Sequence, residues 1–88
     1  MIYSIEIDKD ALKYLQKLER PLRIRITNAL QVLLENPFHS ELDIKRLKGT
    51  ESEFRLRVGS HRVIYSVENQ KLMIYVIKIG SRGDVYKH

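Results

Sequence analysis

Residues 54–67 read FRLRVGSHRVIYSV, and the pattern of this stretch decides the fold. Apolar side chains alternate with arginines before Gly59 and Ser60, and a second apolar run follows that pair. Because successive side chains of a strand point to opposite faces, the alternation predicts one apolar face and one face that carries Arg55 and Arg57. A two-residue connection is typical of a tight antiparallel hairpin. Two guanidinium groups fixed on such a hairpin offer planar forks of donors that match phosphate oxygens.

The remaining elements are predicted from periodicity and from helix signals. Alternating apolar residues indicate a strand over residues 2–7, and Asp8 is expected to cap the helix that follows. Pro21 suits the first position of a second helix, which ends at Asn36 because Pro37 follows. Further strands are expected at 53–58, 61–68 and 71–79, joined by the two-residue turns Gly59-Ser60 and Asn69-Gln70.

This order, β-α-α-β-β-β, predicts an α+β fold in which an N-terminal helical hairpin packs on one face of an antiparallel sheet. The segment 38–52 is irregular and is expected to be a basic loop or a short edge strand. Residues 72–79 are nearly all apolar apart from Lys78, which favours a central strand covered on both sides. The sheet face opposite the helices would then be free to bind a partner.

Composition limits the classes of protein that fit. The chain has 88 residues, of which 43% are hydrophobic, so we expect a single domain over residues 1–88. It has no cysteine, which excludes disulfides and thiolate metal sites and suits a reducing compartment. No signal-peptide pattern and no apolar run of about 20 residues is present, so we expect a soluble cytoplasmic protein with no membrane partner.

The net charge of +5 is concentrated in one half of the chain. Residues 1–44 carry six basic and seven acidic side chains, a net charge of −1, whereas residues 45–88 carry ten basic and four acidic ones, a net charge of +6. Because the cations lie on predicted strands and not on an amphipathic helix, nucleic acid is favoured over a membrane surface. A basic surface that serves only solubility is the alternative.

Arg62 and Arg82 are candidates for a phosphate site. The start of the strand at 61–68 lies beside the end of the strand at 71–79 in an antiparallel pair, so these two arginines are expected to be close. Like charges brought together cost free energy unless an anion lies between them. The pairing therefore predicts an anionic ligand or transition state.

Several short motifs resemble a known family. The chain is similar to the toxins of the RelE branch of the RelE/ParE toxin-antitoxin superfamily over nearly its whole length, in size, charge, helical hairpin and strand order. The segments that carry the resemblance are Lys48-Gly49, FRLRVG at 54–59, HRVIY at 61–65, IGSR at 79–82 and Val85-Tyr86.

The resemblance implies a ribosome-dependent endoribonuclease that cuts mRNA codons in the A site. It implies catalytic roles for Arg62 and Arg82 on the phosphate and for Tyr86 on the RNA. The ribose 2′-oxygen would attack the adjacent phosphorus, a reaction that needs no metal and no cofactor. The implied partners are a cognate antitoxin in a hetero-oligomer, the ribosome and mRNA. The basic residues expected to bind RNA or phosphate are Arg55, Arg57, Lys45, Arg46 and Lys48.

Two departures from the family pattern bear on mechanism. Arg55 and Arg57 stand where relatives often have lysine, and arginine stays charged, so it is a poor general base. Ser81 stands where many relatives have histidine. The general base is left open between Tyr86, Lys45, Lys48 and the ribosome.

Two other functions remain open from the residues. A ParE-like toxin would inhibit DNA gyrase and cut no RNA, and a basic nucleic-acid-binding module would bind without cleavage. His61 lies beside a turn and is expected to face solvent, and the spacing of the three histidines gives no metal-ligand motif.

Overall fold

The predicted hairpin forms the middle of the sheet. The computed structural model describes residues 2–81, and in it β3 (Glu53–Val58) pairs antiparallel with β4 (His61–Glu68). Gly59 has φ of 59°, in the left-handed region that favours glycine, at the first position of the two-residue turn. This turn is the one that the sequence predicts.

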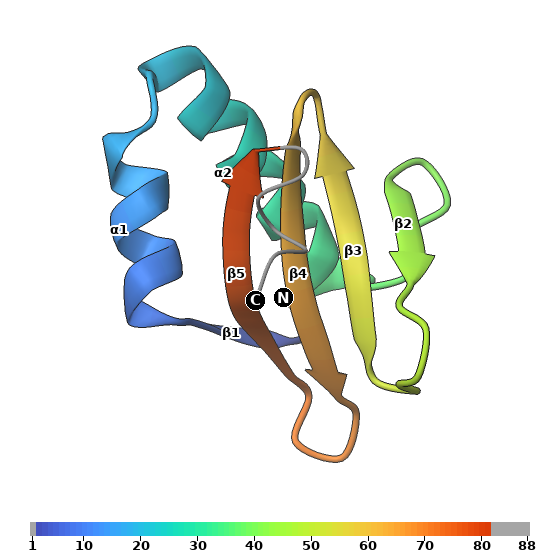
Figure 1. Cartoon of the computed structure of the whole chain (residues 1–88). Coiled ribbons are helices and arrows are strands. Elements are labelled where there is room, and N and C mark those ends of the chain that lie inside the picture. Colours follow the sequence, from blue (N-terminus) through green and yellow to red (C-terminus); the bar gives the residue numbers. More distant parts are fainter. Residues whose placement is uncertain (1, 82–88) are drawn as a thin grey trace.

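The sheet has five strands in the order β1-β5-β4-β3-β2 (Figure 1). The irregular segment contains the short edge strand β2 (Asp43–Arg46), which pairs antiparallel with β3. At the other edge, β1 (Ser4–Ile7) runs parallel to β5 (Met73–Ser81), so an otherwise antiparallel sheet has one parallel pair. The α+β fold with an N-terminal helical hairpin is confirmed, and the structure adds the edge strand and the parallel pair.

The last strand is only partly as predicted. β5 is an inner strand between β1 and β4, but it is not covered on both sides along its whole length, whereas β4 in the middle of the sheet is buried over most of its length. The side chain of Ile77 is 42% exposed because the β4–β5 register shifts there, leaving this residue unpaired. The connection from β4 to β5 spans residues 69–72 and is therefore longer than the predicted two-residue turn.

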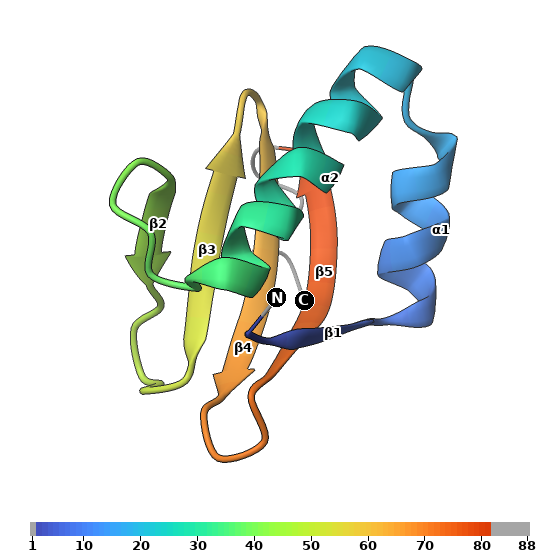
Figure 2. The same cartoon turned by 180° about the vertical axis from the view of Figure 1, so that it is seen from behind.

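The helices α1 (Lys9–Lys17) and α2 (Arg20–Glu35) cover one face of the sheet (Figure 2). Asp8 caps α1 as predicted, because its Oδ2 accepts hydrogen bonds from the backbone N–H groups of residues 10 and 11. The second helix begins at Arg20, one residue before Pro21, and it ends at Glu35 before the Asn36 cap, as expected. No helix in the described part of the chain is long and apolar enough to cross a membrane.

The core lies between the helices and the sheet. The apolar residues of β3, Phe54, Leu56 and Val58, are buried in it, as the sequence predicts. Tyr65 of β4 is fully buried, and its hydroxyl donates a hydrogen bond to the Pro37 carbonyl over 2.8 Å. The other fully buried large side chains are Ile26, Leu33, Leu56, Val63, Ile74 and Val76. No helix of residues 2–81 covers the opposite side of the sheet, which we call the open face.

Candidate nucleic-acid interface

Strand register gathers basic side chains on the open face. Directly opposed residues of neighbouring strands share a face, so the pairing defines rows that run across the sheet. Two adjacent rows near the β3–β4 turn contain most of the cations, and we call them the cationic rows. The first comprises Asp43, Arg57, Arg62 and Gly80, and the second comprises Lys45, Arg55, Ile64 and Lys78.

Arg62 is buried within the first row. It is 6% exposed and directly opposite Arg57, and its Nη1 donates to the backbone carbonyl of His61 over 3.3 Å. No carboxylate of residues 2–81 forms an ion pair with it. Like charges directly opposite one another destabilise a sheet, and a buried charge without a counterion is costly. The arrangement is therefore suited to an anion that enters from outside.

Arg55 is held by an ion pair at the sheet edge. Its Nη2 donates to Oδ1 of Asp43 over 2.7 Å, and the side chains are 16% and 54% exposed respectively. The Nε atom of Arg55 is buried and has no hydrogen-bond partner among residues 2–81. Lys45 lies directly opposite Arg55 on β2, so the second row also contains two opposed cations.

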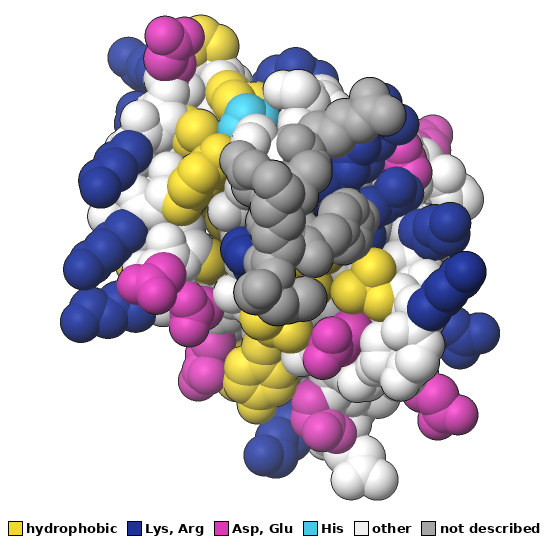
Figure 3. Space-filling view, viewed as in Figure 1, with side chains coloured by type: hydrophobic (Ala, Val, Ile, Leu, Met, Phe, Trp, Pro, Cys, Tyr) yellow, Lys and Arg dark blue, Asp and Glu magenta, His cyan; other side chains and the backbone are white. Residues whose placement is uncertain are grey.

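The open face is polarised from end to end. Next to the cationic rows, toward the β4–β5 loop, one row contains Glu53, Ser66, Tyr75 and Glu6, and the row nearest that loop contains Glu68. In the space-filling view, lysine and arginine side chains gather over β2 and β3, whereas acidic side chains lie toward the β4–β5 loop (Figure 3). A polyanion would therefore be attracted to one end of this face.

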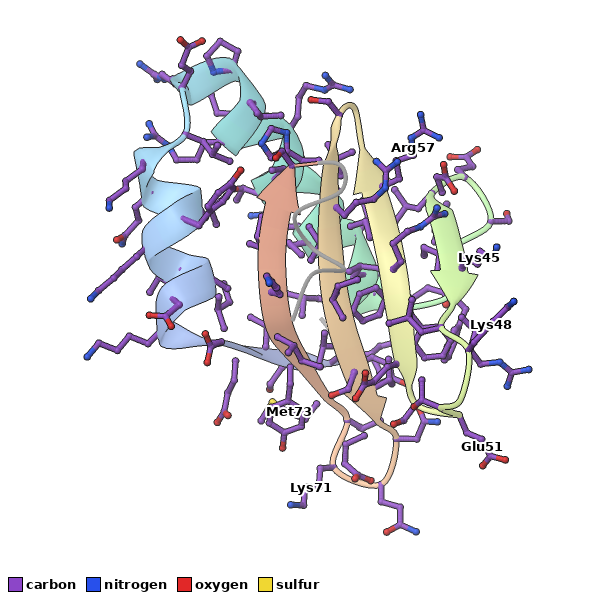
Figure 4. The ribbon with its side chains drawn as sticks, in the orientation of Figure 1. Lys45, Lys48, Glu51, Arg57, Lys71 and Met73 are labelled. Atoms are coloured by element: carbon purple, nitrogen blue, oxygen red, sulfur yellow. The ribbon has the colours of Figure 1, made fainter. Side chains whose placement is uncertain are left out.

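The other predicted basic residues lie at the β2 edge. Arg46 is opposite Phe54, whose side chain points into the core. The side chain of Arg46 therefore leaves the edge strand on the helix side of the sheet. Lys48 lies just beyond β2. Both nevertheless line a hollow of about 350 Å³ together with Lys45, Leu47 and Arg55. Figure 4 shows Lys45 and Lys48 along this edge and Arg57 on β3, all far from Lys71 and Met73 at the opposite end.

Two predicted catalytic residues, Arg82 and Tyr86, lie outside the described residues. The expected closeness of Arg62 and Arg82 stays a prediction. In the described part, Arg62 is opposite Gly80, and Ser81 pairs with His61.

His61 is not solvent-facing, so that prediction is wrong. It is only 9% exposed, and its ring centroid is 6.0 Å from that of Tyr14 on α1. Its Nδ1 lies 3.3 Å from Oγ of Ser60. A residue beside a turn is buried if its side chain lies on the helix side of the sheet. Its position next to the turn in the sequence does not show which side that is. Within residues 2–81 no three side chains of the metal-binding types come together.

Sequence reasoning missed three members of the cationic rows. Asp43 and Lys78 had no assigned role on this face, and Ile64, which is 7% exposed, lies there between the cations. The alternation of Asp43 and Lys45 was a usable signal, because those residues share a face if the segment is a strand. Lys78 could be placed only with the β4–β5 register, which the shift at Ile77 obscures.

Comparison with known proteins gives the family. The sequence profile of the ParE toxin of the type II toxin-antitoxin system parDE matches residues 5–86. The RelE1 protein of Methanocaldococcus jannaschii is 36% identical, with 100% of this chain and 99% of the relative covered. The mRNA interferase toxin RelE of Escherichia coli K12 is 30% identical, with coverages of 98% and 92%.

A solved structure extends the likeness to three dimensions. The archaeal RelE–RelB complex from Pyrococcus horikoshii contains a chain with a TM-score of 0.84 and 32% identity, covering 96% of this chain and 99% of that one. The chain belongs to the RelE/ParE superfamily of type II toxin-antitoxin systems, as a RelE-type toxin.

Proposed function

We propose that this protein is an mRNA endoribonuclease that cuts the A-site codon on the ribosome and so inhibits translation. The observation that carries the proposal is the cross-strand pair of Arg57 and buried Arg62 on the open face, without a carboxylate of residues 2–81 to neutralise Arg62. The similarity to an E. coli mRNA interferase toxin over 98% of this chain supports the same activity.

The proposed reaction is attack of a ribose 2′-oxygen on the adjacent phosphorus. The phosphorus becomes pentacoordinate, negative charge grows on its oxygens, and the bond to the 5′-oxygen breaks. The products are a 2′,3′-cyclic phosphate and a free 5′-hydroxyl, with the proton passing from the 2′-oxygen to the leaving oxygen. Fixed guanidinium groups stabilise this developing charge without having to reorganise.

The cationic rows would divide this work. We assign the scissile phosphate to Arg62 because it is buried and lacks a carboxylate partner among residues 2–81, whereas Arg57, Arg55 and Lys45 bind flanking phosphates. By family resemblance, Arg82 acts on the phosphate and Tyr86 on the RNA. Arginine does not give up its proton, so the acid and base come from other groups.

The proposed partners follow from the relatives. The Pyrococcus toxin was solved in complex with RelB, and we expect a cognate antitoxin to hold this toxin inactive in a hetero-oligomer. An antitoxin that supplies acidic groups to the cationic rows would compete with RNA. Because the proposed targets are the ribosome and mRNA, we expect the toxin to act in the cytoplasm.

Mapping mRNA ends on programmed ribosomes tests the proposal. Wild-type protein should leave 2′,3′-cyclic phosphate ends within the A-site codon, and Arg82→Ala should slow cutting by ~10²-fold if Arg82 stabilises transition-state charge. Lys9→Ala, which removes an exposed charge on the helix side, is the control. Intact mRNA with inhibited gyrase supercoiling would establish the ParE-like alternative. Salt-sensitive RNA binding without cutting or growth arrest would establish a binding module.

A further inference from the structure

Asp43 is the one carboxylate in the cationic rows. It lies on edge strand β2 directly opposite Arg57, yet its Oδ1 accepts a hydrogen bond from Nη2 of Arg55, which is diagonal to it. An acid at this place weakens the attraction of the face for RNA. A role for Asp43 in the proposed site must therefore be something other than phosphate binding.

The surroundings of Arg55 supply that reason. Lys45 is directly opposite it, Arg57 follows two residues later on the same face, and Arg62 is diagonal on β4. Each of these cations repels the guanidinium, and arginine has many rotamers through which to escape into solvent. The side chain nevertheless lies mostly against the sheet, 16% exposed. In the described residues, Asp43 makes the ion pair that opposes this repulsion.

We propose that Asp43 is a positioning residue for the cutting reaction and acts through Arg55. This inference rests on the proposed endoribonuclease function. The carboxylate fixes Arg55 through Nη2, which leaves Nη1 and the second hydrogen of Nη2 for a phosphate oxygen of the RNA. The buried Nε has no partner in the described part of the chain, so the pose has a desolvation cost, which the ion pair offsets.

The proposal separates binding from turnover. Removal of the negative charge raises the attraction of the whole face for RNA, so KM should stay the same or fall. Loss of a preorganised Arg55 misplaces one donor in the transition state, so kcat should fall. A residue that merely repelled RNA would lower KM and leave kcat unchanged. A residue needed only for folding would lower the active fraction and the melting temperature.

Ribosome-dependent cutting by Asp43 variants tests this split. Asp43→Ala should lower kcat by ~10-fold without raising KM, and Asp43→Asn, which keeps an acceptor oxygen but no charge, should lie between it and wild type. Glu41→Ala is the control, because it removes the same charge two residues away from an exposed side chain that forms no ion pair with a described residue. In an Arg55→Ala background, Asp43→Ala should cause no further loss. An undiminished loss there, or an unchanged kcat, would overturn the proposal.

A spectroscopic signature of Arg55 gives a readout without RNA. Because Nε is buried, its N–H resonance in the free wild-type protein should be sharp and slow to exchange with water. Asp43→Ala should broaden it or speed its exchange, and Glu41→Ala should not. An Arg55 resonance unaffected by Asp43→Ala would overturn the positioning role. If wild-type protein leaves mRNA whole, the proposed function fails, and this resonance still decides whether Asp43 orders Arg55.

Discussion

At the scale of single residues, Arg62 is a buried cation that no carboxylate of residues 2–81 neutralises. Arg62 lies on the central strand, is 6% exposed as a residue, stands opposite another arginine and donates a hydrogen bond to a neighbouring carbonyl. Proteins accept a cost of this kind where function needs it, and the open faces of purely structural sheets avoid it. Stability and activity should therefore respond in opposite directions to a change at Arg62.

Replacement of Arg62 by an apolar side chain of similar length should stabilise the fold. Arg62→Met removes a buried cation and its repulsion from Arg57, so the free energy of unfolding should rise by ~1 kcal/mol, while mRNA cutting is lost. Urea denaturation followed by circular dichroism measures the first effect. Arg57→Met, at the exposed partner position, should change stability by less than about 0.5 kcal/mol. A less stable Arg62→Met protein would show that Arg62 supports the fold.

Tyr65 should make stability depend on alkaline pH. Burial raises the pKa of its hydroxyl, which donates to the Pro37 carbonyl. The folded state thus favours the protonated form, so the contribution of Tyr65 is complete below the unfolded pKa of about 10 and is lost as pH rises toward the folded value. Tyr65→Phe should cost ~1 kcal/mol at neutral pH, with a difference from wild type that shrinks above about pH 10. If the two free energies of unfolding differed by the same amount at every pH at which the protein is folded, this prediction would be contradicted. Tyr75→Phe is the control.

At the scale of elements, the β3–β4 hairpin positions the site. Its two-residue turn sets the register that places Arg57 opposite Arg62, and Gly59 takes a positive φ there. An added Cβ would lie 3.3 Å from Nη1 of Arg25, the far end of a flexible side chain that can move away. The conformational preference of the turn, and not the contact, should therefore decide the effect of a substitution.

Gly59→Ala should lower the free energy of unfolding by ~1 kcal/mol, because a Cβ strains the left-handed backbone. Ser60→Ala, in the same turn, should have an effect within about 0.5 kcal/mol. Thermal or urea unfolding checks both. Equal effects of the two substitutions would show that the left-handed backbone at Gly59 does not make a side chain there costly.

The hairpin and both helices could be predicted because their signals are local. Alternation over residues 54–58, the Asp8 cap and the Asn36-Pro37 stop each depend on neighbours in sequence. The parallel pairing of β1 with β5 depends on contacts between the two ends of the chain, which no local pattern encodes. The same holds for the candidate site: Arg55 and Arg57 follow from alternation, whereas the Asp43 ion pair requires the β2–β3 register.

At the scale of the whole molecule, layers and charge work together. The helices cover one side of the sheet, and the described cations of the other side, Lys45, Arg55, Arg57, Arg62 and Lys78, lie in two adjacent rows toward one end. Acidic residues at the opposite end of the open face orient an approaching polyanion. A RelE-type toxin built this way presents a rigid cationic platform formed by central strands.

The salt dependence of RNA binding should report this platform. Each cation that contacts a phosphate of single-stranded RNA adds about 0.7 to the slope of log K against log salt concentration. Arg57→Ala should reduce the slope by about that amount, as measured by fluorescence anisotropy of a labelled oligoribonucleotide. Glu68→Ala, at the acidic end, should leave the slope unchanged. Equal slopes for wild type and Arg57→Ala would place the RNA elsewhere.

The most direct test of the central claim is the single-turnover rate of mRNA cutting by Arg62→Ala on programmed ribosomes at saturating toxin. If Arg62 stabilises the charge on the scissile phosphate, the rate should fall by ~10²-fold or more, with toxin binding to the ribosome retained and Arg62→Lys recovering part of the loss. Cutting at the wild-type rate by a folded Arg62→Ala protein would contradict the account.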